Sequence, residues 1–459
     1  MRKLPAIAAG VTAAMIAAVA LASSATAGDQ NPDSSASGAI KHVMVIDLEN
    51  EDFNTSFGPN SPAKYLNETL VPKGQLLTNY FATGHFSTDN YLAQVSGQAP
   101  NRVSGNDCIT DTKTFASTYT DVTPGTLDPN QAKYPGQVDG SGCVYPSSVK
   151  TIGDQLDARA AQEQADDQGA DEGASKLAWR QYAEDMGNDP ARDHGTPDPL
   201  GGTDCAHPAA NGTFPNHSTT TDQYAIRHVP FLFFHSVTDN AASCNQHVVP
   251  LGSVKTTATG DTFTGHLAED LAHKSTTPAF SMVTPNVCND GHDDTCVGTN
   301  TEGGHAGGLV GADLWLKHWM PLILNSPAYK SGEMLVVVTF DEASASDSSA
   351  CCGEQPGPDN ANPGYPPLAA LFTGEKPPTA PGQYPGGGRV GAVLLNSKLV
   401  APGSVNATPY NHYSALRSYE DLLGITSGGS DGRGHLGFAG QTGLRPFGTD
   451  VFAKREDSN

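Results

Sequence analysis

The chain has little positive charge and few aromatic residues. It contains 26 Lys and Arg against 49 Asp and Glu, which gives a formal net charge of −23. A surface this acidic repels nucleic acids and anionic membranes at long range, so a nucleic-acid-binding role is disfavoured. Aromatic residues make up 7% of the chain, and no amphipathic helix suited to membrane docking stands out. These absences disfavour a lipid-binding surface.

Long apolar runs and two common site motifs are also missing. Beyond the N-terminal segment no run of 18 apolar residues occurs, so we expect a soluble mature protein with no stable membrane insertion. There is no G-x-S-x-G sequence, which weakens a Ser-His-Asp hydrolase interpretation. None of the cysteine spacings matches a zinc ribbon, so a cysteine-based metal site is not expected.

The first residues are typical of an exported protein. Arg2 and Lys3 precede a small apolar stretch over residues 6–22, and Ala25-Thr26-Ala27 is a small-x-small cleavage signal. We therefore predict a signal peptide over residues 1–27, a disordered lead over 28–39 and one catalytic domain over 40–455. The predicted location is secreted or extracellular.

An even number of cysteines in an exported chain favours disulfides. Cys288 and Cys296 are close enough to close a small loop, and Cys108 and Cys143 are placed to tie a long Gly- and Pro-rich excursion over residues 98–148. The neighbours at 351 and 352 are expected to pair with other cysteines rather than with each other.

Apolar segments alternate with helical patterns along the whole chain. Strands are predicted near residues 42–48, 76–81, 179–182, 230–235, 280–284, 335–340 and 390–395, and helices at about 88–96, 151–165, 309–324 and 413–423. Runs rich in Val and Ile with little polar alternation are typical of strands buried on both faces of a parallel sheet. The fold class predicted is therefore a single α/β domain, with a mostly parallel sheet flanked by helices and long loops over its carboxyl edge.

Two acidic couplets follow the most apolar of these strands. Asp47-Leu48-Glu49-Asn50 ends one run, and Asp341-Glu342 ends the other. Ligands gather at the carboxyl ends of parallel strands, so these side chains could form one oxygen-rich cage for a divalent cation. Either couplet alone could instead be a helix cap or a solvated turn.

A serine stands at the start of the helix that follows the second strand. Ser87 lies where backbone N–H groups and the helix dipole favour an anion, and a nearby metal would activate its hydroxyl as a nucleophile. Thr88 is the neighbouring candidate. Simple N-capping is the structural alternative, because serine is strongly preferred at such positions.

Polar clusters later in the chain could supply acid–base groups. Asp290, His292 and Asp293 follow the strand near 280–284, and they could donate a proton, bind a ligand or merely stabilise a disulfide-closed turn. His305 lies in a Gly-rich loop that permits close approach to a ligand. His228 is interpreted as organising the entry to the strand near 230–235. His412 is interpreted as capping the last helix, with a position at the site as the alternative.

In their order along the chain, these motifs resemble a known family: the secreted phosphoesterases that include bacterial acid phosphatases and phospholipases C, relatives of the alkaline-phosphatase superfamily. The matching pieces are Val45-Ile46-Asp47-Leu48-Glu49-Asn50, His85-Phe86-Ser87-Thr88-Asp89-Asn90-Tyr91, residues 284–293, Asp313-Leu314-Trp315-Leu316, Val338-Thr339-Phe340-Asp341-Glu342 and residues 412–424. The resemblance covers about residues 40–425.

The resemblance implies a role for each matching residue. It implies an alkaline-phosphatase-like fold, with Ser87 as a nucleophile that forms a phosphoseryl intermediate. Metal ligands would be Glu49, Asn50, Asp341 and Glu342, binding a divalent cation that could be Ca, Mg, Mn or Zn. Phosphoryl stabilisation or protonation of the leaving group would fall to Asp290, His292 and His305, with the division among Asp290, His292 and Asp293 left open.

The chain departs from many relatives in having Phe86 and Asp89 where they have proline.

The function predicted is a secreted, metal-dependent phosphoric-ester hydrolase, most like a phosphomonoesterase of the acid-phosphatase type. A phospholipase C acting on lipid headgroups is the alternative within the enzyme class, and a small phosphate ester or a phospholipid is the expected partner. The alternative from another class is a secreted binding protein whose cation is purely structural. Ser87 argues against the last, because a structural cation site does not require it.

Overall fold

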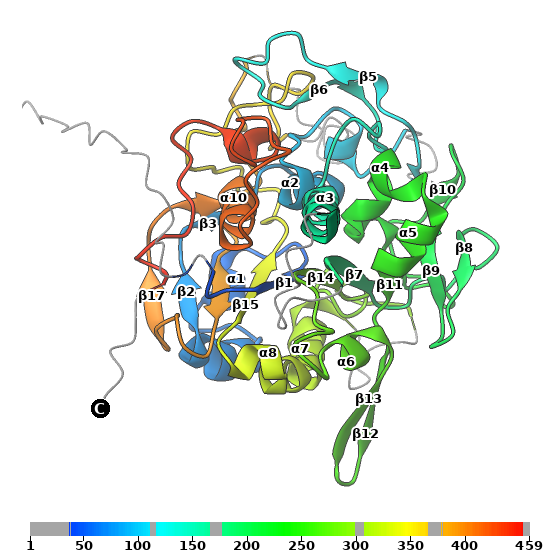
Figure 1. The fold of residues 1–459 in the computed structure, drawn as a ribbon, viewed down its shortest axis with the longest axis vertical. Helices are drawn as coiled ribbons and strands as arrows, with labels where there is room; N and C mark the ends of the chain where they lie inside the picture. Colours follow the sequence, from blue (N-terminus) through cyan, green and yellow to red (C-terminus); the bar gives the residue numbers. More distant parts are fainter. Residues whose placement is uncertain are drawn as a thin grey trace, which may run out of the picture.

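The computed structural model describes residues 36, 38–110, 116–165, 177–298, 307–365, 378 and 380–452. An eight-stranded sheet crosses the molecule in the order β11-β7-β14-β1-β15-β16-β2-β17 (Figure 1). Its strands are β1 (His42–Leu48), β2 (Gln75–Leu77), β7 (Trp179–Ala183), β11 (Val248–Pro250), β14 (Phe280–Thr284), β15 (Met334–Phe340), β16 (Ala392–Leu395) and β17 (Ser404–Asn406). Five of the seven pairings are parallel, and only those of β16 are antiparallel. The mostly parallel α/β sheet predicted from the sequence is confirmed.

The two central strands carry the acidic couplets. Every residue of β1 and β15 is buried, as the continuous apolar runs predict for strands covered on both faces. The strands run parallel in a register that pairs Ile46 with Val338 and Leu48 with Phe340. Strands β1 and β15 therefore end at the same level of the sheet, and this brings Glu49 next to Asp341.

Helices cover both faces of the sheet. On one face lie α2 (Ser87–Ser96), α3 (Ile152–Ala165) and α10 (His412–Leu422), and on the other lie α6 (His266–Asp270), α7 (Gly308–Asn325) and α8 (Pro327–Lys330) (Figure 1). The inner face of α7 buries Trp315, Leu316 and Trp319. Asp313 on α7 accepts hydrogen bonds from the N–H groups of Tyr65 and Leu66. Among the described residues, no helix is both long enough and apolar enough to span a membrane.

Smaller elements surround this core. The short helices are α1 (Phe53–Phe57), α4 (His235–Thr238) and α5 (Ala241–His247), with single turns at η1 (Leu66–Leu70), η2 (Val71–Lys73), η3 (Ser104–Asn106), η4 (Ile226–His228), η5 (Pro230–Phe233) and η7 (Gly437–Gly440). The two-stranded pairs are β3 (Tyr80–Phe81) with β18 (Tyr410–Asn411), β4 (Ser117–Thr118) with β10 (Thr213–Phe214), β5 (Thr123–Leu127) with β6 (Val138–Ser141), β8 (His194–Pro197) with β9 (Thr203–His207), and β12 (Ser253–Thr257) with β13 (Gly260–Thr264).

Two of the predicted strands differ in the structure. Residues 230–233 form the 3-10 turn η5, although Phe231, Leu232 and Phe233 are fully buried. Pro230 lacks an N–H for a strand ladder and suits a first helical turn, and a short apolar run cannot by itself distinguish a buried strand from a buried turn. The strand predicted over 76–81 is divided, because β2 ends at Leu77 and the separate strand β3 pairs with β18.

All eight cysteines are paired. The disulfides are Cys108–Cys143, Cys205–Cys244, Cys288–Cys296 and Cys351–Cys352. The first and third confirm the two loops predicted from the sequence. The prediction for Cys351 and Cys352 is wrong: the other six cysteines pair among themselves, which leaves the two neighbours to each other. The predicted signal peptide and most of the predicted lead lie outside the described residues.

A buried histidine near the C-terminus should make stability depend on pH. His435 contacts Asp431 at 2.7 Å and Asp421 at 3.0 Å. Burial lowers its pKa, but these two carboxylates outweigh burial, so the pKa of His435 is raised above 6.5. Such a group contributes its full stability below the unfolded pKa and loses it as pH rises through the folded pKa.

We therefore expect His435→Gln to lower the free energy of unfolding by about 1–3 kcal/mol at about pH 5.5, and by much less at about pH 8.5. Urea unfolding of both proteins at the two pH values measures this. His318→Gln, at the half-buried contact with Asp261, is the matched control. An equal loss at both pH values would contradict the charge-based explanation.

Candidate active site

The carboxyl ends of β1 and β15 are joined by an asparagine. The backbone N–H of Asn50 donates to Asp341 Oδ1 at 3.0 Å, and its side-chain Nδ2 donates to Glu49 Oε2 at 3.0 Å. Asn50 has φ 55°, in the left-handed region that asparagine adopts more readily than most residues. The turn thus holds the two buried carboxylates side by side, as the strand register requires.

The hydroxyl of Ser87 faces this pair. Ser87 is the first residue of α2 and is almost fully buried, and its Oγ donates to Glu49 Oε2 at 2.7 Å. The neighbouring hydroxyl is directed elsewhere, because Thr88 donates to Asp107 Oδ1 from both its N–H, at 2.9 Å, and its Oγ, at 3.0 Å. The helix N-terminus therefore presents Ser87, not Thr88, to the carboxylates of the couplet.

A strained turn places Ser87 at the helix start. Phe86 has φ 77° and ψ 146°, a conformation that costs a bulky residue about 1–3 kcal/mol. Glu342 holds this turn: its Oε2 accepts the N–H of Phe86 at 3.0 Å and contacts His85 Nδ1 at 2.5 Å. Burial lowers the pKa of His85, but the adjacent Glu342 carboxylate outweighs it and raises that pKa overall. Glu342 thus anchors the turn, whereas one oxygen of Asp341 stays without a partner.

The conformation of Phe86 predicts opposite outcomes for two substitutions. Proline fixes φ near −65° and has no N–H to donate to Glu342, so Phe86→Pro should destabilise the protein by about 3 kcal/mol or more and abolish turnover. Glycine adopts φ 77° without strain, so Phe86→Gly should keep kcat within about threefold. Thermal unfolding and kcat of both variants measure this. A fully active Phe86→Pro enzyme would show that the strained turn is not needed.

A buried histidine links Glu49 to the third loop of the site. His228 Nε2 lies 3.1 Å from Glu49 Oε1, and its Nδ1 lies 3.1 Å from Asp290 Oδ2. The ring is fully buried and stacks on Tyr91 at 4.9 Å between centroids. The interpretation of His228 as a strand-entry residue is therefore wrong, because no strand follows it and its ring lies inside the site. No motif around His228 signals this role, which depends on chain segments far apart in sequence.

Asp290 joins the same network through its backbone and its side chain. Its carbonyl accepts the N–H of Glu49 at 2.9 Å, and its Oδ1 accepts the N–H of His292 at 2.8 Å. The His292 ring lies 6.4 Å from the His228 ring between centroids. Asp290 thus lies against the couplet, and His292 lies beyond His228. His305 lies outside the described residues.

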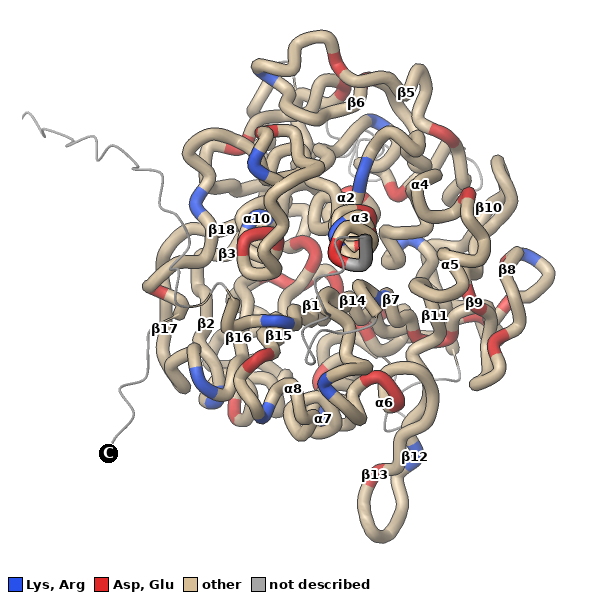
Figure 2. The backbone as a smooth tube through the Cα atoms, viewed as in Figure 1, with Lys and Arg blue, Asp and Glu red and all other residues tan. Residues whose placement is uncertain are grey.

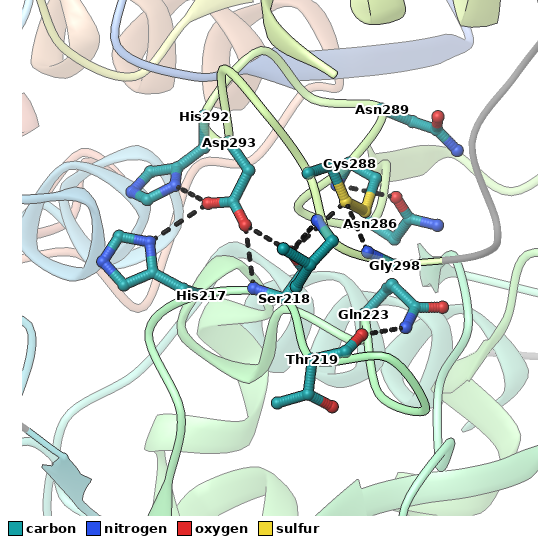
Figure 3. The surroundings of a disulfide bond; sticks show 12 residues. His217, Ser218, Thr219, Gln223, Asn286, Cys288, Asn289, His292, Asp293 and Gly298 are labelled. Carbon is teal, nitrogen blue, oxygen red and sulfur yellow. Dashed lines mark hydrogen bonds and ion pairs between the residues drawn. A yellow bond between two sulfur atoms is a disulfide. The ribbon is translucent and has the colours of Figure 1, made fainter. Parts of the chain in front are cut away.

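The turn after Asp290 is braced from a second loop (Figure 3). Asp293 Oδ1 contacts His292 Nδ1 at 2.7 Å and His217 Nδ1 at 3.1 Å, and its Oδ2 accepts the N–H of Ser218 at 2.8 Å. The Cys288–Cys296 disulfide closes the same turn. Asp293 therefore serves here to orient His292, while His217, which sequence reasoning missed, lies beside it at the surface.

His412 contacts the site from the start of α10. Its Nε2 lies 2.7 Å from the backbone carbonyl of Asp341, and its Nδ1 lies 3.2 Å from the hydroxyl of Tyr80. The helix cap is the preceding residue, Asn411, whose side chain accepts the N–H of Ser414. His412 therefore does not cap the helix. It is a buried residue beside the acidic couplet, as the alternative interpretation expected.

The site holds more buried negative charge than buried positive charge. Figure 2 shows Asp and Glu above the central strands, near α2 and α10. The buried carboxylates are those of Asp47, Glu49, Asp89, Asp107, Asp290, Asp341 and Glu342. Against them stand the guanidinium of Arg227, whose Nε lies 3.5 Å from Asp107, and the histidines. Burial and the neighbouring carboxylates raise the pKa of Glu49 and of Asp341.

Several carboxylate oxygens in this cluster have no hydrogen-bond donor. They are Asp341 Oδ2, Asp47 Oδ1 and both oxygens of Asp89, while Glu49 Oε1 and Asp290 Oδ2 have only the His228 ring beside them. An unneutralised buried carboxylate is costly, and a hard divalent cation is the group that oxygen atoms of this kind bind. Glu49, Asn50 and Asp341 therefore fit a cation, while Glu342 is already held by His85 and Phe86.

Two tighter sets of potential ligands occur among the described residues. They are His217, His292 and Asp293, and Asp198, Asp204 and His266, and within each set the ligand atoms all lie within 4.8 Å of one another. The four ligands predicted from the sequence are not one of these sets.

Comparison with known proteins decides the family. The model of the Phosphoesterase family matches residues 63–426. The chain belongs to this family. The resemblance to phosphoesterases inferred from the ordered motifs is confirmed.

The chain is also similar to curated fungal proteins. It is 27% identical over 344 residues to a phosphate-repressible acid phosphatase of Penicillium chrysogenum, covering 72% of this chain and 59% of that protein. It is 24% identical to an acid phosphatase of Aspergillus fumigatus, covering 72% and 55%. The chain thus spans little more than half the length of these relatives.

Similarity to solved structures is weaker. An alkaline-phosphatase-superfamily protein of Vibrio parahaemolyticus has 12% identity and a TM-score of 0.39, covering 86% of this chain and 68% of that one. The alkaline phosphatase PafA has 10% identity and a TM-score of 0.37, covering 90% and 99%.

Proposed function

We propose that this protein is a secreted, metal-dependent phosphomonoesterase of the acid-phosphatase type, with Ser87 as its nucleophile. The observation that supports this most directly is the 2.7 Å hydrogen bond from Ser87 Oγ to Glu49, made at a helix N-terminus among carboxylate oxygens that lack donors. A bound divalent cation would supply Lewis-acid activation of the hydroxyl and offset charge on the phosphoryl group. The residues that would hold it are Glu49, Asn50 and Asp341, with Glu342 fixing the turn beside them.

In the proposed reaction each of these residues has a definite part. Ser87 Oγ attacks phosphorus while its proton passes to Glu49 Oε2, the atom that already accepts it; an Oγ–P bond forms and the bond to the leaving oxygen breaks. The N-terminus of α2 would favour the phosphoryl oxygens, although the N–H of Thr88 is already bound by Asp107. Water then attacks phosphorus, the Oγ–P bond breaks, phosphate leaves, and Ser87 Oγ takes back a proton from Glu49.

The acid–base groups come from the loop after β14. His292, oriented by Asp293 and partly open to solvent, would give a proton to the leaving oxygen in the first step. His228 is a positioning residue, because it contacts Glu49 and Asp290 and is fully buried. His305 stays a proposed contributor from the resemblance alone.

We further propose that the substrate is a small phosphate monoester and that the protein is secreted. The acidic shell and the low aromatic content favour a small phosphate monoester over a lipid surface, and the named relatives are acid phosphatases. Four disulfides suit an oxidising compartment, which supports secretion.

Turnover on two kinds of substrate tests the function. We expect the mature protein to hydrolyse p-nitrophenyl phosphate, to lose that activity in chelator, and to regain it with added divalent cations. Phosphatidylcholine vesicles should be hydrolysed at least about a hundredfold more slowly. Faster hydrolysis of the phospholipid would replace the monoesterase by a phospholipase C. No hydrolysis of either, with the cation bound, would favour a structural cation in a binding protein.

A further inference from the structure

A second cluster of metal-ligating side chains lies at the edge of the sheet, away from Ser87. Asp198 follows β8, Asp204 lies in β9, and His266 opens α6. One potential ligand atom from each lies within 4.8 Å of the others. The hairpin β8–β9 lies beside β11, the edge strand, whereas the acidic couplet lies at the central strands β1 and β15 (Figure 1). The cluster is therefore separate from the proposed catalytic site.

The contacts within the cluster leave one buried carboxylate oxygen without a donor. His266 Nε2 lies 2.7 Å from Asp198 Oδ2, and Asp198 Oδ1 accepts the N–H of Leu200 at 2.6 Å. Asp204 is 8% exposed, and its buried Oδ1 has no hydrogen bond. The nearby cation, Arg180, is already held by Asp270 at 2.6 Å. Among the described residues, no hydrogen bond thus reaches this oxygen of Asp204, which lies beside the ion pair of Asp198 with His266.

The backbone around the three residues is fixed from both sides. The Cys205–Cys244 disulfide ties β9 to α5 at the residue next to Asp204. Before His266, Gly265 has φ 95°, and a Cβ at that position would lie 2.3 Å from the Cα of Gly252. Such an approach is open only to glycine and holds the start of α6 against the segment that follows β11. The ligand positions are therefore set by rigid neighbours, as a preformed metal site requires.

We propose that Asp198, Asp204 and His266 form a structural binding site for a divalent first-row transition ion, with Zn²⁺ the best match. One imidazole nitrogen and two carboxylate oxygens suit Zn²⁺, Co²⁺ or Mn²⁺, whereas Ca²⁺ prefers six to eight oxygen ligands. Binding replaces the hydrogen bond between His266 and Asp198 by a bond from each to the ion, and a proton on Nε2 or on a carboxyl is released to solvent. Water completes the coordination.

The site would clamp two segments that are far apart in sequence. It joins the β8–β9 hairpin to α6, which are 62 residues apart between Asp204 and His266. Because the ion would bind the folded chain and not the unfolded one, its effect is on stability rather than on turnover. This distinguishes it from the cation proposed at Glu49 and Asp341, whose loss should remove activity.

The experiment is metal analysis and Zn²⁺ titration of the full-length mature protein and four variants. His266→Ala and Asp204→Asn should each weaken the binding of one Zn²⁺ by at least about tenfold and abolish the rise in melting temperature that Zn²⁺ gives the wild type. His266→Gln keeps a donor for Asp198 without the imidazole and should also lose the ion, which separates ligation from folding. All three should keep turnover within about twofold in the presence of saturating catalytic cation.

Asp341→Asn is the matched control at the other site, and it should retain the Zn²⁺-dependent rise in melting temperature. Co²⁺ substitution gives a second reading, because a visible absorption band of the wild type should be missing in His266→Gln. Equal Zn²⁺ content and equal thermal shifts in wild type and His266→Gln would overturn the proposal, because they would show that the His266 imidazole binds no ion.

Discussion

Ser87→Ala is expected to reduce kcat for p-nitrophenyl phosphate by about 10³-fold or more, with the cation still bound. Removing the nucleophile of a covalent mechanism leaves only binding and electrostatic stabilisation, and losses of this size or larger follow in enzymes of comparable design. The change deletes one oxygen that donates to Glu49 at the start of α2. Steady-state kinetics and metal analysis of the same preparation measure both quantities.

Thr88→Ala is the matched control for Ser87. Its hydroxyl is turned to Asp107 and not to the acidic couplet, so kcat should fall far less than in Ser87→Ala. Trapping by rapid acid quench with a ³²P-labelled monoester should label the wild type but not Ser87→Ala. Undiminished turnover in Ser87→Ala would remove Ser87 as the nucleophile, and a larger loss in Thr88→Ala would transfer the role to its neighbour.

Asp341→Asn is expected to affect activity and stability in opposite directions. Asparagine is nearly isosteric and keeps an acceptor for the N–H of Asn50, but it removes the charge whose free oxygen would bind the cation. Cation affinity should fall by at least about 10–100-fold, and turnover at limiting cation should fall with it. In chelator, the variant should be more stable than the wild type by about 1–3 kcal/mol, because one uncompensated buried charge is gone.

Asp47→Asn is the matched control on the neighbouring strand end. Asp47 is buried as deeply, but it lies within β1, where Gln94 binds its Oδ2 at 2.5 Å, and it is not joined to the couplet by Asn50, so it should not contribute to cation affinity. Calorimetric titration with Mg²⁺, Mn²⁺, Ca²⁺ and Zn²⁺ compares the three proteins and identifies the preferred ion. If Asp341→Asn bound the cation as tightly as wild type, the proposed ligand set would be wrong.

The central part of the fold could be predicted because its signals are local. The runs that become β1 and β15 are apolar without alternation, which indicates strands buried on both faces. The helix start at Ser87 and the stop at Gly97, which has φ 67°, are equally local signals. Local signals fail for residues 230–233. Pro230 and the three large apolar residues after it are buried in a 3-10 turn, and the same composition would also suit a buried strand.

In the site, too, some features follow from short sequence motifs and others depend on contacts between distant segments. The sequence by itself determined the acidic couplets, the serine at a helix start and the cluster around Asp290, because each is a short motif next to a recognisable element. Only the tertiary structure decided that Thr88 turns to Asp107, that Glu342 holds the Phe86 turn, and that His228 lies between Glu49 and Asp290. These contacts join segments far apart along the chain, and their geometry depends on strand register and on the packing of α2, which no local pattern specifies.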